Sequence, residues 1–279
     1  MRNPQPLTRP RHFLRISSLR ACLAAGALIA AAGGAHAQAF DAVRLFGVPA
    51  GAGEGLVGVA AISSPAYQGS DERRLRGYPI LDYRWTNGWF VGTGNGAGYN
   101  FSRNPQWQYG ARVTVDLGRK EHRSPALAGM GDVPVRPEIG GFLNYFINDR
   151  AFLTSSLRYG AGEDHDGAIV DLGAGYALPI AAQWRAAFGV AASLVNGAYM
   201  RNYFGVSPAQ SARTGYAVHE PGAGVRDVRA TASITYYLTS EWSFTALAGV
   251  SQLQGDAKDS PITRERNGVN GVLAASYLF

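Results

Sequence analysis

Apolar and polar positions alternate with a period of two along most of the chain. The segment "WQYGARVTVDL" (107–117) places its large apolar side chains on one face and Gln108, Arg112 and Thr114 on the other. Segments 183–195, 225–238 and 241–253 repeat this alternation. These runs are longer than the usual soluble strand of about five or six residues. Length and alternation together predict strands that cross a bilayer with an apolar outer face and a small or polar inner face.

The same pattern predicts twelve strands. Because this number is even, the first strand begins and the last strand ends at the same rim, the one with the short turns. They cover residues 54–62, 76–85, 88–93, 96–102, 107–117, 136–147, 151–160, 168–179, 183–195, 225–238, 241–253 and 268–279. The third and fourth strands hold "GTGNGAGYN" (92–100), whose glycines suit a tight hairpin. One bent strand over 88–102 is the alternative, and it would make the strand count odd.

Short and long connections alternate between these strands. Residues 86–87, 102–105, 148–149, 181–182 and 239–241 are short turns, whereas 63–74, 118–134, 161–167, 196–224 and 254–268 are long loops. Short turns at one rim and long loops at the other are typical of outer-membrane barrels. The sequence therefore predicts an all-β fold over 54–279: a transmembrane antiparallel β-barrel of about 12 strands, with short periplasmic turns and long extracellular loops.

Aromatic residues gather near the predicted short turns. Tryptophan prefers the bilayer interface, where its ring is half wet. The chain also ends on an alternating strand, "NGVLAASYLF" (270–279), which looks like the signal by which outer-membrane barrels are recognised for assembly. We therefore expect the barrel-assembly machinery as a partner and an aromatic belt made of Trp85, Trp89, Trp107, Trp184, Trp242, Tyr277 and Phe279.

The N-terminus has the features of a secretory signal peptide over residues 1–37. Five arginines and no acidic residue precede the apolar run "ACLAAGALIAAAGG", and "AHA" (35–37) forms a cleavage site. Cleavage would remove five of the 26 basic residues and none of the 20 acidic ones, leaving 21 against 20. The basic balance then gives no reason to expect a nucleic-acid partner. Cys22, the one cysteine, would also be lost, and residues 38–53 would form a periplasmic segment.

Charged residues of both signs fall on the predicted inner face. They could line a hydrated pore, or they could pair across a small lumen and close it, because a barrel of about twelve strands lies between filled and open. The many small inward residues favour a narrow water-filled lumen. The candidates for lining it are Arg112, Asp116, Glu138, Arg158, Asp171, Arg185, Asp227 and Arg229.

Two long loops carry a helix-start pattern. A capping serine with proline in the first turn occurs in "SPAQ" (207–210) and in "SPIT" (260–263). Short helical turns there could fold over the lumen as a lid, or they could simply order the loops. The residues concerned are Tyr203, Phe204, Ser207, Pro208, Gln210, Ser260 and Pro261.

No motif marks a catalytic or cofactor site. "GTGNGAG" does not fit the dinucleotide fingerprint, and no helix follows it. Glu163, Asp164 and Asp166 flank His165, where they could orient an imidazole or hold a divalent cation, although a solvated polar loop is the simpler reading. No serine stands in a nucleophile motif. We therefore expect a protein that is not an enzyme and that binds no cofactor or metal.

Four separated segments resemble a known family. "SPAYQGSDERR", "YPILDYRW", "NYFGVSPAQSA" and "DSPITRERNG", in this order, are similar to signature segments of the MipA/OmpV outer-membrane proteins. The resemblance covers about residues 50–279. It implies the outer membrane of a Gram-negative bacterium, with membrane lipid and lipopolysaccharide around the barrel.

The resemblance also implies a role. One member type is a scaffold that joins a lytic murein transglycosylase to a murein synthase; others are discussed as porin-like channels or adhesins, and a hydrolase at the rim is a further alternative. A stable interface needs roughly 800 Å² per partner, and residues 38–55 are the main periplasmic segment. Val43, Leu45, Phe46 and Val48 could anchor a partner or pack into the barrel mouth.

Overall fold

The computed structural model describes residues 53–160 and 167–279. All described residues belong to one compact unit of the chain. The predicted signal peptide and the segment 38–52 lie outside the described residues, as does the acidic stretch around His165. Among the described residues, no helix is long and apolar enough to span a membrane.

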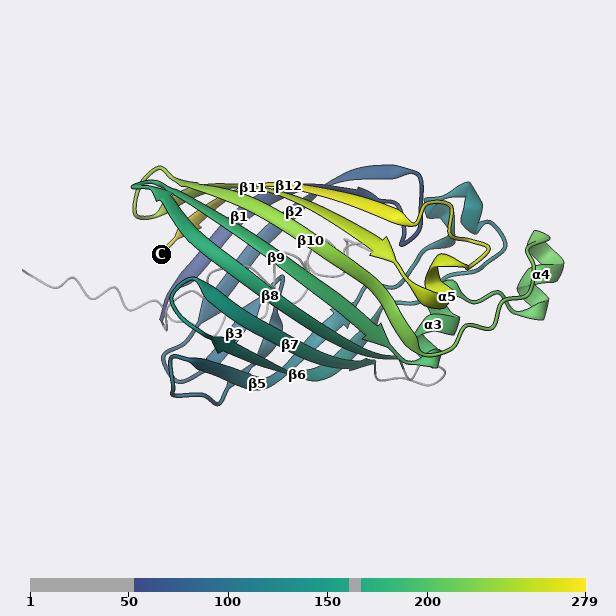
Figure 1. The fold of residues 1–279 in the computed structure, drawn as a ribbon, viewed down its shortest axis with the longest axis horizontal. Coiled ribbons are helices and arrows are strands. Elements are labelled where there is room, and N and C mark those ends of the chain that lie inside the picture. Colours follow the sequence, from purple (N-terminus) through teal and green to yellow (C-terminus); the bar gives the residue numbers. More distant parts are fainter. Residues whose placement is uncertain (1–52, 161–166) are drawn as a thin grey trace, which may run out of the picture. The chain divides into compact units, whose positions relative to one another are not determined.

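Twelve antiparallel strands form one closed barrel, as the sequence predicts, and each strand pairs with its neighbours in chain order (Figure 1). The strands are β1 (Gly55–Pro65), β2 (Arg73–Arg84), β3 (Trp89–Gly92), β4 (Gly96–Asn100), β5 (Trp107–Asp116), β6 (Arg136–Phe146), β7 (Ala151–Gly160), β8 (Ala168–Ala181), β9 (Trp184–Val195), β10 (Gly224–Tyr237), β11 (Trp242–Leu253) and β12 (Asn267–Leu278).

The first and last strands close the sheet. They pair from Leu56 opposite Leu278 to Ser63 opposite Gly271. Gly55 and Phe279 exchange both backbone hydrogen bonds, each 2.9 Å long. A Cβ at Gly55 would lie 2.4 Å from the Phe279 ring and 2.8 Å from the Tyr83 ring, so a larger residue there would have to displace these rings. This pairing satisfies the backbone groups that the facing edges of β1 and β12 would otherwise leave unpaired in lipid.

Residues 88–102 form a hairpin of two short strands, so the alternative of one bent strand is wrong. The turn uses Gly96 at φ 73°, and a Cβ there would lie 2.1 Å from the Val113 carbonyl oxygen. The β3–β4 connection spans only residues 93–95 although it lies on the side of the long loops. The regular alternation of short and long connections therefore fails at this one hairpin.

The outer face of the barrel is apolar. Val59, Leu75 and Leu273 are each at least 65% exposed, whereas the residues between outward positions are mostly buried or half-buried. This arrangement places hydrocarbon side chains where lipid would contact them and leaves small or polar side chains inside.

A girdle of tryptophan–tyrosine pairs surrounds the short-turn rim. The five tryptophans are 37–54% exposed. Four of them stand directly opposite a tyrosine on the neighbouring strand, with ring centroids 4.4–5.2 Å apart. Cross-strand aromatic pairs stabilise a sheet beyond the area they bury. The pairs are Trp89–Tyr99, Trp107–Tyr145, Trp184–Tyr236 and Trp242–Tyr277. The fifth tryptophan, Trp85, directly follows β2 and contacts Tyr83 near the end of that strand.

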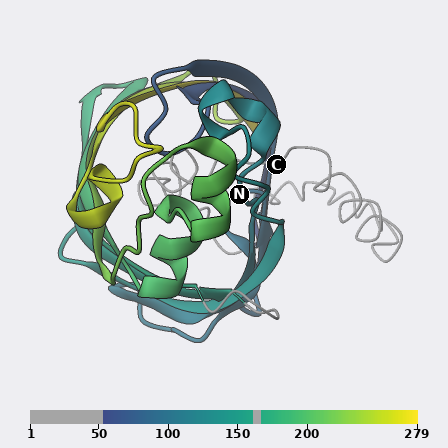
Figure 2. The same cartoon turned by 90° about the vertical axis from the view of Figure 1, so that its right-hand side faces the viewer.

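The long loops carry short helices that lie across the opposite end of the barrel (Figure 2). They are η2 (Glu121–Arg123), η3 (Pro125–Leu127), α3 (Gly197–Phe204), α4 (Pro208–Thr214) and α5 (Gly255–Lys258). The pattern at Ser207 predicted α4: its side chain and that of Gln210 form a capping box, with Pro208 in the first turn. At Ser260 and Pro261 the chain forms a single turn, in which the Thr263 N–H donates to the Ser260 carbonyl, and the helix of this loop, α5, lies earlier.

Candidate functional site

The interior of the barrel holds a chain of buried ion pairs contributed by β6, β7, β8 and β10. Arg158 contacts Glu138 at 3.4 Å and Asp171 at 2.9 Å, and Arg229 contacts Asp171 at 2.9 Å and Asp227 at 3.0 Å. With Arg226, these residues are at most 7% exposed. We call this set the ionic network: Glu138, Arg158, Asp171, Arg226, Asp227 and Arg229. Its three arginines balance its three carboxylates.

Arg226 connects the ionic network to the loop helix above it. Its Nε donates to Asp227 at 2.6 Å, its Nη1 to the Tyr199 hydroxyl at 2.8 Å and its Nη2 to Ser193 at 3.1 Å. Strict alternation points Arg226 away from the lumen, so the sequence pattern missed it. A bulge between Val225 and Asp227 shifts the register of β10 against β9 and brings two successive side chains inward.

The other predicted lumen residues lie apart from the ionic network. Arg112 donates to Ser156 at 2.7 Å and lies over the Phe142 ring. Asp116 accepts hydrogen bonds in the cap described below. Arg185 is exposed near the short-turn rim, with its guanidinium 5.6 Å from the centre of the Tyr237 ring. The structure thus brings five of the eight together and leaves three in separate contacts.

A cluster of buried apolar side chains lies on the inner face of β1, β2, β11 and β12, away from the strands that carry most of the ionic network. It consists of Ala60, Ile62, Tyr78, Leu247 and Val272. The charges of the ionic network are thus gathered on β6, β7, β8 and β10. Charges on a single wall can pair with each other along neighbouring strands, which lowers the cost of burying them.

Helix α3 is fixed over the lumen by hydrogen bonds to three other loops or strand ends. The Tyr203 hydroxyl donates to Asp116 at 2.6 Å, and Arg119 donates to the Tyr203 carbonyl at 2.8 Å. Ser260 donates to the Phe204 carbonyl at 2.6 Å, and the Phe204 side chain is fully buried. We call this assembly of α3 with its partners the cap.

Two stacked tyrosines form the inner side of the cap. The rings of Tyr199 and Tyr203 lie 4.5 Å apart. Burial raises the pKa of Tyr199 to about 12, and burial together with the nearby Asp116 carboxylate raises the pKa of Tyr203 well above 10. Both hydroxyls therefore stay protonated at neutral pH, and Tyr203 can act as the donor to Asp116.

A hydrogen bond and apolar contacts join the β1–β2 and β11–β12 loops beside the cap. Tyr67 donates its hydroxyl proton to the Ile262 carbonyl at 2.7 Å, and burial raises the pKa of Tyr67 to about 12. Both residues belong to a buried apolar cluster that also includes Leu127 of the β5–β6 loop. A small cavity of about 30 Å³ lies between the β1–β2 loop, the β5–β6 loop and the tyrosines of α3.

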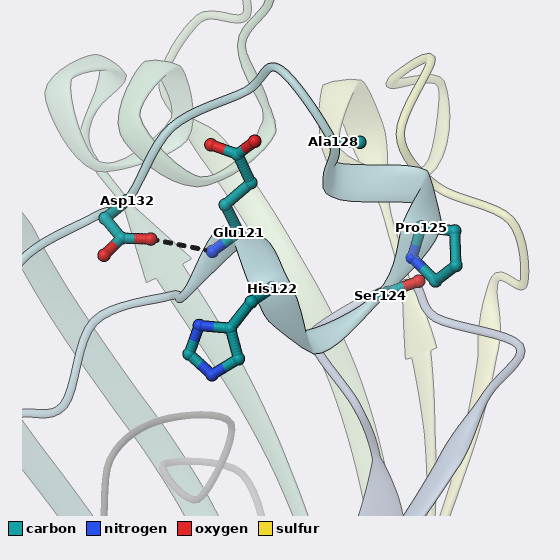
Figure 3. A pocket seen from close by; sticks show the side chains of 6 residues that line it. All are labelled: Glu121, His122, Ser124, Pro125, Ala128 and Asp132. Carbon is teal, nitrogen blue, oxygen red and sulfur yellow. Dashed lines mark hydrogen bonds between the residues drawn. The ribbon is translucent and has the colours of Figure 1, made fainter.

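A larger hollow lies on the surface of the β5–β6 loop (Figure 3). It has a volume of about 490 Å³ and is lined in part by Glu121, His122 and Asp132. Asp132 accepts from the Glu121 backbone N–H at 2.8 Å and from Lys120 at 2.9 Å. Glu121 accepts from the N–H groups of two glycines of the same loop. The carboxylates thus serve to fold the loop.

Nothing in the described part of the chain gathers three or more metal-binding side chains. His219 contacts the Asp256 carbonyl oxygen at 3.1 Å and His122 is exposed, so the two histidines lie in separate surroundings. The alternative of a cation site around His165 concerns residues outside the described ranges and is not tested by the structure.

Comparison with known proteins gives one family match. Residues 57–279 match the model of the family described as MltA-interacting protein MipA. No curated protein sequence matches the chain. Among solved structures, the fold is similar to the NanC porin, with 11% identity, a TM-score of 0.48, and coverage of 79% of this chain and 98% of that one.

Two further structures have similar folds. An outer-membrane channel from Pseudomonas putida F1 is 13% identical, with a TM-score of 0.45 and coverage of 83% of this chain and 97% of that one. The outer-membrane channel DcaP of Acinetobacter baumannii is 10% identical, with a TM-score of 0.39 and coverage of 84% and 99%.

Proposed function

The chain belongs to the MltA-interacting protein MipA family, and from this premise we propose that it is a closed outer-membrane barrel that serves as a scaffold in murein remodelling. The single observation that carries the proposal is that six inward charges pair with one another in the buried ionic network, below an α3 helix that hydrogen bonds fix at the long-loop end. A channel that selects solutes by charge exposes charged side chains to its hydrated path, whereas the six charges of the ionic network bind one another.

The charge balance supports a closed wall over a selective pore. A pore that attracts one sign of solute needs side chains of that sign exposed to water. Here the three arginines of the ionic network each contact a carboxylate, and all six side chains are buried. Exposing one of these charges to a passing solute would require separation of its buried ion pair, which costs several kcal/mol for each uncompensated charge.

The family description names MltA as the interacting partner of its members. For this chain we propose a partner of the same class, a lytic murein transglycosylase, and through it a murein synthase. The enzymes that act on murein face the periplasmic rim. The turns at that rim are short, at residues 85–88, 101–106, 147–150, 182–183 and 238–241. We therefore propose that residues 38–52 supply much of the interface.

A capture experiment tests this assignment. The mature barrel (38–279), immobilised in lipid nanodiscs, should retain a purified lytic murein transglycosylase. Deletion of residues 38–52 should reduce the amount retained about tenfold. Replacement of 208–214 by glycine and serine, at the opposite rim, should leave it unchanged. Failure of the intact barrel to retain the enzyme would contradict the scaffold role. Equal retention after the deletion would assign the docking to the short turns instead.

A further inference from the structure

The barrel wall is incomplete on the long-loop side, between β2 and β5. Strand β2 pairs with β3 only from Asp82 to Arg84, and β5 pairs with β4 only from Gly110 to Val113. Residues 73–80 of β2 therefore have a strand partner on one side only. At about 3.3 Å per residue, this unpaired edge extends for about 25 Å. We call the gap above the short β3–β4 hairpin the notch.

Three arginines meet at the notch. Arg74 and Arg76 lie two residues apart on β2, on the face that also carries the buried Tyr78. Arg123 comes from η2 in the β5–β6 loop, and Arg74 donates to its carbonyl oxygen across the gap. We call Arg74, Arg76 and Arg123 the arginine cluster. Arg74 and Arg76 are half-buried, so water reaches them, whereas Arg123 is only 5% exposed.

The carboxylates near the arginine cluster already accept hydrogen bonds from other groups. Glu121 and Asp132 accept hydrogen bonds from donors of their own loop, and Asp116 accepts from Tyr203 and from the Gly118 N–H. Within the described residues, the Arg123 Nη1 group is buried with no hydrogen-bond partner. An unpaired buried donor costs about 1–3 kcal/mol, more when charged.

The buried arginines of the ionic network provide a comparison for Arg123. There, each arginine contacts a carboxylate at 3.4 Å or less. At the notch, Arg123 instead faces two further arginines. Burial first, and then the positive charges of Arg76 and Arg74, lower the pKa of Arg123 to about 10. The guanidinium stays charged at neutral pH, and an external anion would offset both the repulsion and the missing acceptor.

We propose that the arginine cluster binds a phosphate group. Phosphate oxygens accept from guanidinium groups in charge-assisted, often bidentate pairs, and a doubly charged anion suits several cations on one side. Two sources present this chemistry: the phosphate of a lipid headgroup that enters through the notch from the outer leaflet, and free phosphate that enters from water. The proposal does not depend on the scaffold role.

The test measures phosphate binding to the full mature barrel. In nanodiscs of lipid without net charge, inorganic phosphate is titrated by calorimetry. In a second arm, the nanodiscs carry lipid A, and its retention through purification is measured by mass spectrometry. Arg123→Gln and Arg74→Gln each remove one guanidinium group that is proposed to bind the phosphate. Arg266→Gln is the matched control, because Arg266 is an exposed arginine at the same end of the barrel, outside the arginine cluster, and lies 3.7 Å from the Asp259 carboxylate.

We expect saturable binding in at least one arm, weakened about tenfold or more by either cluster variant and unchanged by Arg266→Gln. Binding in the first arm identifies free phosphate as the source, and retention only in the second identifies the lipid. Circular dichroism verifies that each variant keeps its barrel. Arg74→Gln changes a half-buried side chain and should fold, so it tests the proposal even if Arg123→Gln does not fold. Absence of binding in both arms, or equal binding by folded Arg74→Gln, would overturn the proposal.

Discussion

Asp171 is the centre of the ionic network, so its neutralisation should destabilise the barrel strongly. Its two carboxylate oxygens each accept from one arginine at 2.9 Å, Oδ2 from Arg158 and Oδ1 from Arg229, and Oδ1 also accepts from Ser193. Asp171→Asn keeps the shape of the side chain but removes the charge and one acceptor. Two buried guanidinium groups would then share the remaining carboxylates.

The expected loss follows from these contacts. A hydrogen bond to a charged group contributes about 1.5–3 kcal/mol, and two such bonds are weakened. Loss of one partner from a buried ion pair costs about 3–5 kcal/mol in general. We therefore expect Asp171→Asn to lower the free energy of unfolding by about 4 kcal/mol. Arg158→Gln added to it should cost less than the sum of the two single changes, since both remove the same pair.

The assay is urea unfolding in lipid vesicles, followed by the fluorescence of the girdle tryptophans. Asp149→Asn is the control, because Asp149 lies exposed in the short turn after β6 and should change stability by less than about 0.5 kcal/mol. A loss below about 1 kcal/mol for Asp171→Asn, or strict additivity with Arg158→Gln, would refute the claim that these buried charges hold the wall together.

Three further predictions concern the cap and the girdle. Tyr203→Phe removes the donor to Asp116 and should raise hydrogen exchange of α3 about fivefold to tenfold, in line with a loss of about 1 kcal/mol; unchanged exchange would show that this bond does not fix α3. Because the folded-state pKa of Tyr203 lies well above 10, the stabilisation from this group is fully present below pH 10 and is lost as the pH rises through the folded value. Ultraviolet titration should therefore show several tyrosines that ionise late, among them Tyr67, Tyr199 and Tyr203, and Tyr203→Phe should reduce the amplitude of the late step by one tyrosine. Trp107→Ala removes the ring that packs on Tyr145 and should lower unfolding stability by at least about 1 kcal/mol, measured in the same urea assay; no loss would mean that the pair does not stabilise the rim.

The strands and rims could be predicted because they follow from local pattern. Alternation gives strands, and turn length separates the two rims. Tryptophan position alone located the girdle, since each tryptophan is within a few residues of a short turn. The tyrosine partners could not be assigned, because which residues stand opposite depends on the strand register.

The ionic network could be predicted only in part. The alternation of inward and outward positions predicted that Asp171 and Arg229 face the lumen. Which charged side chains contact each other could not be predicted, because it depends on the register between neighbouring strands. Arg226 was missed because a bulge interrupts the alternation, and no sequence signal marks that bulge. Arg123 was missed for another reason: it sits in a loop, where no period exists, and its burial depends on how the loop folds against β2.

The measurement that tests the closed lumen most directly is single-channel recording of the mature barrel in a planar bilayer. Buried, balanced charges and a hydrogen-bonded cap predict a silent protein, with no stable ohmic steps at neutral pH. Asp171→Asn combined with Tyr203→Phe, which weakens both the network and the cap, should give intermittent conductance. Steady ohmic conductance of the unchanged barrel, altered in ion selectivity by Arg229→Gln, would contradict the account and establish an open channel.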